Sequence, residues 1–220
     1  MCGRFVLFTT EEKLLAAATS LIDAPEATIQ APEGTPPPRY NVAPTQMIAM
    51  MRLASPSEAL LEPARWGLLP HWKKDISGPP LFNARAETVQ EKPSFRDAFK
   101  TQRCVIPLDG YYEWKDKKPY FVRRVDGELL WAAGLWSTGL GQLSATMITT
   151  DAPEPMQDLH HRLPRFLQAE EARQWLIDDT TTAAQLLHPS GQELVAQLRI
   201  SPADPAVGAV KNDYPELIGH

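Results

Sequence analysis

Proline limits what this chain can fold into. The 220 residues include 21 prolines, which are spread along the chain and form no repeat. A proline inside a helix removes a hydrogen bond and clashes with the preceding turn, so this distribution favours loops and short strands over long helices. The chain is 43% hydrophobic and 22% charged, which is typical of a globular protein with a sizeable core.

Apolar runs between turn residues predict a β-rich fold. Strands are expected at 2–8, 46–53, 60–69, 103–108, 120–125, 129–136 and 144–150. Asp126-Gly127 predicts a hairpin between 120–125 and 129–136. We therefore expect one α+β domain over residues 1–220, built on a curved, mostly antiparallel, barrel-like sheet with a few flanking helices.

Three helical segments are expected beside this sheet. Thr9 is predicted to cap the first, with Glu12 reaching back to it, and this helix should end before Pro25. The others are predicted near 94–100 and at 169–177, where apolar residues recur with helical spacing. Segment 39–45 is predicted to be a polar loop.

Cysteine and charge content narrow the class of protein. Cys2 and Cys104 form neither a disulfide framework nor a zinc-type spacing, and five histidines do not complete one, so we expect no metal or cofactor. A reducing cytoplasm is expected, since no secretory or membrane-spanning run is found. We also expect a monomer. The net charge of −5 argues against a nonspecific nucleic-acid coat but permits a local arginine-lined groove.

The second residue carries unusual chemistry if an aminopeptidase removes Met1. Cys2 then presents a thiol and a primary amine on adjacent carbons. An aldehyde condenses with the amine to give a Schiff base, and the neighbouring thiolate closes a five-membered thiazolidine. An incidental cysteine after the start codon is the plain alternative, and the terminus alone does not decide between them.

Two further segments have polar or aromatic groups suited to a ligand. Trp72, between histidine and lysines in loop 70–80, suits stacking on a nucleobase. Asn83, Arg85 and Glu87 point to one face if their segment is extended. That face is either solvated or offers Arg85 to an anionic ligand.

Proton-transfer groups occur in two more segments. Glu113 lies between aromatic residues, where it could transfer protons or pair with Lys115 or Lys117. Of the adjacent His160 and His161, one could act as a general acid or base. We expect the side chains of adjacent histidines to diverge, so a shared metal is not expected.

Taken together, these segments resemble the SRAP family, whose name stands for SOS response-associated peptidase. The matching motifs are MCGRF at 1–5, RYNVAPT at 39–45, WG at 66–67, NARAET at 83–88, GYYEWK at 110–115, HHRLP at 160–164 and VG…VKN at 207–212. Any one of them is a weak signal. Their order along nearly the whole chain is specific.

The resemblance implies a protein that binds single-stranded DNA, or a single-strand/duplex junction, and crosslinks itself to an abasic site through a thiazolidine, with β-elimination as a possible secondary lyase activity. By position it assigns catalytic roles to Cys2, Asn83, Glu113 and His160. Phosphate contacts would be Arg4, Arg39, Arg85 and Arg162, and the bases beside the lesion would be handled by Asn41, Pro44, Trp72 and Trp114.

One position departs from the family pattern. His71 stands where an aromatic partner for Trp72 would be expected, which affects the stacking geometry and leaves the chemistry intact. Two alternatives remain open at this point. The chain could be a cysteine autoprotease that removes its own Met1, or a noncovalent reader of modified DNA bases.

Overall fold

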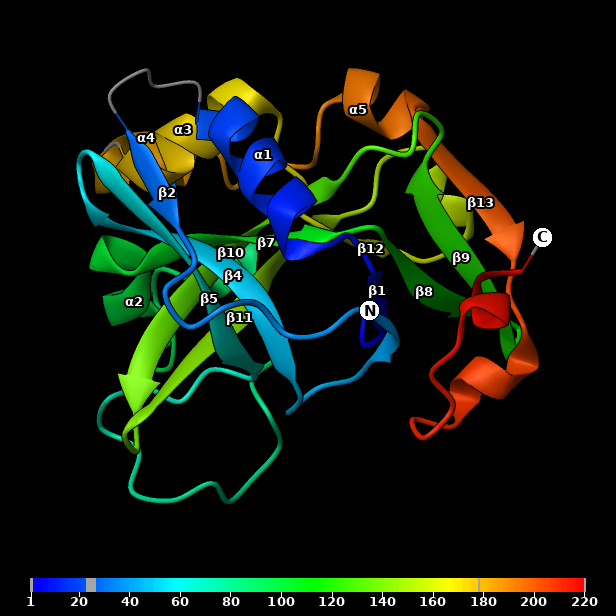
Figure 1. The fold of residues 1–220 in the computed structure, drawn as a ribbon, viewed down its shortest axis with the longest axis horizontal. Coiled ribbons are helices and arrows are strands. Elements are labelled where there is room, and N and C mark those ends of the chain that lie inside the picture. Colours follow the sequence, from blue (N-terminus) through cyan, green and yellow to red (C-terminus); the bar gives the residue numbers. More distant parts are fainter. Residues whose placement is uncertain (1, 23–26, 178, 220) are drawn as a thin grey trace.

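The computed structural model describes residues 2–22, 27–177 and 179–219 (Figure 1). Its strands are β1 (Phe5–Leu7), β2 (Thr28–Gln30), β3 (Arg39–Val42), β4 (Met47–Ser55), β5 (Glu58–Trp66), β6 (Asn83–Arg85), β7 (Arg103–Leu108), β8 (Gly110–Lys115), β9 (Lys118–Arg124), β10 (Leu130–Gly139), β11 (Gln142–Asp151), β12 (Arg162–Pro164) and β13 (Leu198–Pro202). Its helices are α1 (Glu11–Ile22), α2 (Arg96–Thr101), α3 (Ala169–Ile177), α4 (Thr180–Gln185) and α5 (Gln192–Ala196), with short 3₁₀ turns η1 (Ala86–Thr88), η2 (Met156–Asp158), η3 (Pro205–Gly208) and η4 (Pro215–Ile218).

The larger of two sheets closes on itself. β5 pairs with β4, β4 with β7, β7 with β10 and β10 with β11, and β11 returns to β5. Only the β11–β5 contact in this ring is parallel. β2, β6 and β12 extend the sheet outside the ring. The expected α+β fold with a barrel-like, mostly antiparallel sheet is therefore confirmed.

Two tight hairpins have the left-handed backbone that two-residue turns require. Asp116 and Lys117 join β8 to β9 with φ of 51° and 63°. Leu140 and Gly141 join β10 to β11 with φ of 54° and 72°. Paired positive φ values match the twist of the flanking strands. These turns set the register of both sheets.

The hairpin predicted at Asp126-Gly127 is wrong. β9 pairs with β8 and β13 in the smaller sheet, whereas β10 pairs with β7 and β11 in the larger one. This turn therefore carries the chain from one sheet to the other. A turn motif indicates a reversal of direction, but long-range packing decides which strands pair.

Local expectations near the N-terminus also need correction. The predicted strand at 2–8 is only three residues long, and the predicted loop at 39–45 begins with β3, which pairs with β1. Thr9 is not a helix cap: its hydroxyl and backbone N–H donate to the carboxylate of Asp109, at 2.5 and 2.8 Å. α1 begins two residues later. Pro25, expected beyond this helix, lies outside the described residues.

The smaller sheet has one face on the main core and the other under the C-terminal segment. Its strand order is β13-β9-β8-β1-β3. Because successive side chains alternate, Phe5 and Tyr111 point into the main core, while Val6 and Tyr112 pack with Val207 of the C-terminal segment. The main core includes residues of both sheets, and the single domain over 1–220 stays a prediction.

Short helices flank the barrel. α1 and α3 pack against each other, and α3 also contacts β7 (Figure 1). None of the described helices is long and apolar enough to cross a membrane. Cys2 precedes β1 of the smaller sheet, and its carbonyl accepts a hydrogen bond from Asn83 of β6 in the larger sheet, so the N-terminal segment contacts both sheets.

Candidate functional site

The N-terminal segment is held by both sheets. On the smaller sheet, Phe5 pairs with Tyr111 across β1 and β8, and the Tyr112 N–H donates to the Arg4 carbonyl at 2.8 Å. From the larger sheet, the Asn83 amide Nδ2 donates to the carbonyl oxygen of Cys2 at 2.7 Å. Residue 2 is thereby fixed in a buried position, with 1% of its surface exposed.

An acidic group lies close to this cysteine. Glu113, on β8, is 5% exposed. Burial is the main cause that raises the pKa of the Cys2 thiol, and the charge of Glu113 raises it further. The same carboxylate also raises the pKa of Tyr111, after the larger effects of burial and Cys2. Charges act on pKa values mainly at short range, so these side chains share one site.

The histidine of the site comes from the loop before β12. The backbone N–H of Arg162 donates to His160 Nδ1 at 2.9 Å. The ring stacks on His161 with centroids 4.3 Å apart, so the expectation that the two histidine side chains diverge is wrong. Burial lowers the pKa of His160, and the charge of Glu113 partly offsets this. His160 is therefore mainly neutral near pH 7. An acceptor Nδ1 places its proton on Nε2.

The structure thus brings together the four side chains to which the sequence assigned catalysis. Cys2, Asn83, Glu113 and His160 come from the N-terminal segment, β6, β8 and the loop before β12. Tyr111 joins them, and sequence analysis did not single it out. The sequence did indicate Tyr111, because it precedes Glu113 by two residues on the same strand and so points to the same face of the sheet. Among the described residues, no three His, Cys, Asp or Glu side chains lie close enough to hold a metal ion.

Several predicted DNA contacts have accessible surface. Trp72 is 52% exposed in the loop between β5 and β6, and Arg85 is exposed at the end of β6. Pro44 and Trp114 are half-buried, and the guanidinium of Arg4 lies over the Trp114 ring, 5.9 Å from its centroid. Their contact with DNA remains a prediction.

Asn41 and Arg4 instead bind the C-terminal segment. Asn41 is fully buried, and its amide Nδ2 donates to the carbonyls of Val207, Ala209 and Asn212 at 3.2, 3.1 and 2.6 Å. Arg4 donates to Asn41 Oδ1 at 2.9 Å and to the Val207 carbonyl at 2.7 Å. The side chain of Asn41 has no exposed surface in this structure, and its predicted contact with the bases stays a prediction.

Arg39 and Arg162 already have carboxylate partners. Arg39 forms an ion pair with Asp213. Arg162 is 7% exposed and donates to Glu87 at 2.7 Å and to Asp151 at 2.6 Å. Direct contact of Arg162 with phosphate is therefore not supported by this structure. Sequence spacing could not show this, because the carboxylates lie on other elements.

The predicted common face of the 83–87 segment is only partly right. The extended part ends at Arg85, and Glu87 lies in the turn η1. Asn83 consequently faces the N-terminal segment, whereas Glu87 faces β12 through its pair with Arg162. The charge of Arg85 nevertheless contributes to the lowered pKa of Glu87, so the two side chains remain within electrostatic range of each other.

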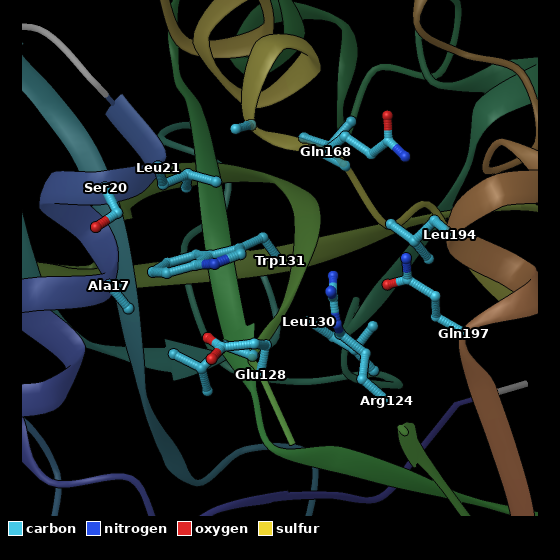
Figure 2. A pocket seen from close by; sticks show the side chains of 13 residues that line it. Ala17, Ser20, Leu21, Arg124, Glu128, Leu130, Trp131, Gln168, Leu194 and Gln197 are labelled. Carbon is cyan, nitrogen blue, oxygen red and sulfur yellow. The ribbon is translucent and has the colours of Figure 1, made fainter. Parts of the chain in front are cut away.

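A cavity of about 360 Å³ lies elsewhere, between α1, β10 and α5 (Figure 2). Trp131 forms part of its wall. Two of its polar side chains are engaged with neighbours: Arg124 donates to Asp126 at 2.9 and 2.5 Å, and Gln168 to Glu193 at 3.5 Å. It shares no lining residue with the site around Cys2, which has the reactive groups, so we do not assign the chemistry to this cavity.

Comparison with known proteins agrees with the motifs and with the fold. The model of a family described as SOS response associated peptidase (SRAP) matches residues 1–210. Over 99% of both chains, this protein is 38% identical to abasic site processing protein YoqW of Bacillus subtilis and 35% identical to abasic site processing protein YedK of Escherichia coli. A crystal structure from Bacteroides thetaiotaomicron has the same fold, with a TM-score of 0.80 over 99% of each chain at 22% identity.

Proposed function

Because this chain belongs to the SOS response associated peptidase (SRAP) family, we propose that it captures abasic sites in single-stranded DNA, or at a single-strand/duplex junction, as a covalent adduct of residue 2. YoqW and YedK are named abasic site processing proteins. The observation that carries the proposal is the convergence of Asn83, Glu113 and His160 on Cys2 from three separate segments. These are the groups that capture of an aldehyde requires.

Opening of the sugar is the first step. An abasic deoxyribose is mostly a closed hemiacetal, with a small amount of open aldehyde. His160 is neutral near pH 7 and has its proton on Nε2. It donates the Nε2 proton to the ring oxygen, and a bridging water takes the proton of the anomeric hydroxyl and returns one to Nε2. The C1′–ring oxygen bond breaks, and C1′ becomes an aldehyde.

The amine reacts next. Removal of Met1 gives Cys2 a free amine, whose ordinary pKa of about 7.7–8.0 leaves an appreciable neutral fraction at pH 7. It attacks C1′, and loss of water gives an iminium. Glu113 accepts the amine's proton, returns a proton to the hydroxyl group that leaves as water, and as a carboxylate then stabilises the iminium charge. Asn83 holds the Cys2 carbonyl and so orients the terminal residue.

Ring closure is the last step. Burial raises the pKa of the Cys2 thiol, so the sulfur is protonated before the substrate binds and does not compete with the amine. The sulfur adds to C1′ of the iminium, and the thiol proton passes to the carboxylate of Glu113. The product is a thiazolidine that contains the protein and the DNA less one water. If β-elimination at the Schiff base precedes closure, the strand is cleaved, which gives the secondary lyase activity.

Intact mass tests the proposal. Protein that lacks Met1 is mixed with an oligonucleotide that has one abasic site, and the mass should rise by that of the oligonucleotide less water. An oligonucleotide with tetrahydrofuran in place of the deoxyribose has no aldehyde and should give no adduct. Protein that retains Met1 and still forms the stable adduct would refute the mechanism.

The same experiment separates the alternatives. A cysteine peptidase would cleave a peptide and give no DNA adduct. Its usual nucleophile is a thiolate, which the buried, protonated Cys2 thiol does not favour. A noncovalent reader would bind both oligonucleotides equally, and Cys2→Ala would leave its binding unchanged.

A further inference from the structure

Arg162 joins three elements behind the site. Its Nη1 donates to Glu87 Oε1 at 2.7 Å and to Asp151 Oδ1 at 2.6 Å. Its Nη2 donates to Glu87 Oε2 at 3.0 Å and to the Thr149 carbonyl at 2.6 Å. The two contacts with Glu87 make a bidentate pair, which restricts the geometry more than a single contact does. The start of β12 is thus fixed to η1 and to β11.

The buried positive charge of Arg162 is compensated by the carboxylates of Glu87 and Asp151. The side chain of Arg162 is 6% exposed, whereas those of Glu87 and Asp151 are 49% and 80% exposed. The hydrogen bonds from Arg162 lower the pKa of Glu87, so the carboxylate stays ionised. A buried guanidinium that loses a carboxylate partner must move toward water or find another acceptor. Loss of either carboxylate should therefore shift β12.

The backbone of the same arginine faces the catalytic histidine. The Arg162 N–H donates to His160 Nδ1 at 2.9 Å, and the Arg162 carbonyl oxygen lies 3.2 Å from the same nitrogen. The first contact requires the proton on Nε2, and the second would require it on Nδ1. The shorter contact favours the Nε2–H tautomer. Tautomer and ring orientation thus depend on where the Arg162 backbone lies.

We propose that Glu87 and Asp151 are positioning residues, which act through Arg162 to keep the proton of His160 on Nε2. This inference rests on the proposed role of His160 in opening the sugar. We call the contacts of Glu87 and Asp151 with Arg162 the clamp. When these contacts are weakened, the Nδ1 atom of His160 loses its fixed N–H donor and the Nδ1–H tautomer becomes populated. Nε2 then has no proton to donate, and sugar opening slows. The two carboxylates need not touch DNA for this effect.

Arg162 itself is a poor target, because removing a buried guanidinium can unfold the protein. Glu87→Gln and Asp151→Asn keep the shape of the side chains and remove the charge. Asp126→Asn is the matched control, because it weakens a similar arginine–carboxylate pair with Arg124 in another turn. Thermal unfolding should confirm that all three variants are folded at the assay temperature.

The tautomer is measured directly in protein labelled with ¹⁵N-histidine. Long-range proton–nitrogen spectra separate protonated from unprotonated ring nitrogens, and His160→Gln assigns the signals by their loss. Wild type and Asp126→Asn should show His160 with protonated Nε2. Glu87→Gln and the double variant Glu87→Gln/Asp151→Asn should show a mixture. A spectrum of the double variant identical to that of wild type would overturn the proposal.

The rate of adduct formation is the second measurement. Glu87→Gln should slow it about tenfold, which corresponds to one charge-assisted hydrogen bond, with affinity for tetrahydrofuran DNA unchanged within about twofold. In a His160→Gln background the same change should have no further effect. An equal slowing in that background would also overturn the proposal. If wild type forms no adduct, the proposed function fails, while the tautomer spectra still decide whether the clamp acts on His160.

Discussion

The two cysteines of this chain are equally buried and have different neighbours. Both are at most 1% exposed, and burial raises the pKa of both thiols. The carbonyl of each accepts a hydrogen bond from a side chain, that of Cys2 from Asn83 at 2.7 Å and that of Cys104 from Trp175 at 2.9 Å. The backbone environments are therefore similar.

The difference lies in the polar groups around the sulfur and in the position along the chain. Cys104 lies inside β7, and its Sγ is so close to Gly134 of β10 that a Cβ there would come within 2.9 Å. Cys2 is next to Glu113 and at the start of the chain. Burial alone gives a protonated, inert thiol. A reactive site further needs an acid, a proton shuttle and a free amine.

Exchanging either cysteine for alanine should give the largest contrast. Cys2→Ala removes the sulfur that closes the ring, so the stable adduct should fall at least about a hundredfold. Cys104→Ala should leave the adduct rate unchanged and lower the stability by about 1 kcal/mol, because it removes one buried atom from a packed strand. Intact mass after denaturation and thermal unfolding measure the two effects. Equal adduct yields would contradict the assignment of Cys2.

Part of the fold around the two cysteines could be predicted from the sequence. Local periodicity predicted β7 at 103–108 and α3 at 169–177 with the bounds that the structure has. It missed the switch between sheets at Asp126-Gly127 and the parallel closure of β11 on β5. Both depend on contacts between residues far apart in sequence, which local patterns do not encode.

The site was predicted from motifs, and its geometry was not. The order of the motifs placed Cys2, Asn83, Glu113 and His160 in one site, and the structure brings them together. Spacing could not show that the side chain of Asn41 is fully enclosed. Three carbonyls beyond residue 206 occupy its amide. The carbonyls lie far along the chain, so only the folded structure shows that Asn41 is a support for the C-terminal segment.

His160 is the proposed proton shuttle, and replacing it should make the surroundings of Cys2 more like those of Cys104. His160→Gln should slow adduct formation by about 10²–10⁴-fold, the usual contribution of general acid–base catalysis. Binding of tetrahydrofuran DNA should stay unchanged, since the ring donates a proton and is not assigned to bind phosphate. His161→Gln is the matched control, because that ring stacks on His160 and is exposed. A normal rate in His160→Gln would remove the histidine from the mechanism.

The pH dependence of the rate of adduct formation tests the same role of His160. Burial lowers the pKa of His160 below its ordinary 6.5. Its neutral form is thus present above the lowered value and is lost as the pH falls through it. The amine limits the rate below about pH 8. Adduct formation should therefore rise about tenfold per pH unit up to pH 7, with a steeper fall below the His160 pKa. In His160→Gln the steeper limb should be absent from the measured rates.

The smallest and most specific test compares the two side chains that donate to the cysteine carbonyls, Asn83 to Cys2 and Trp175 to Cys104. Asn83 Oδ1 is buried and has no hydrogen-bond partner among the described residues, so the amide can hold the Cys2 carbonyl with Nδ2 and offer Oδ1 to the freed amine. Asn83→Ala should slow adduct formation up to about tenfold, which corresponds to one hydrogen bond. Trp175→Phe removes the equivalent donor to Cys104 and should lower the stability by about 1–2 kcal/mol, with the rate unchanged. If both substitutions slow the adduct equally, Asn83 acts through the stability of the fold and does not orient residue 2.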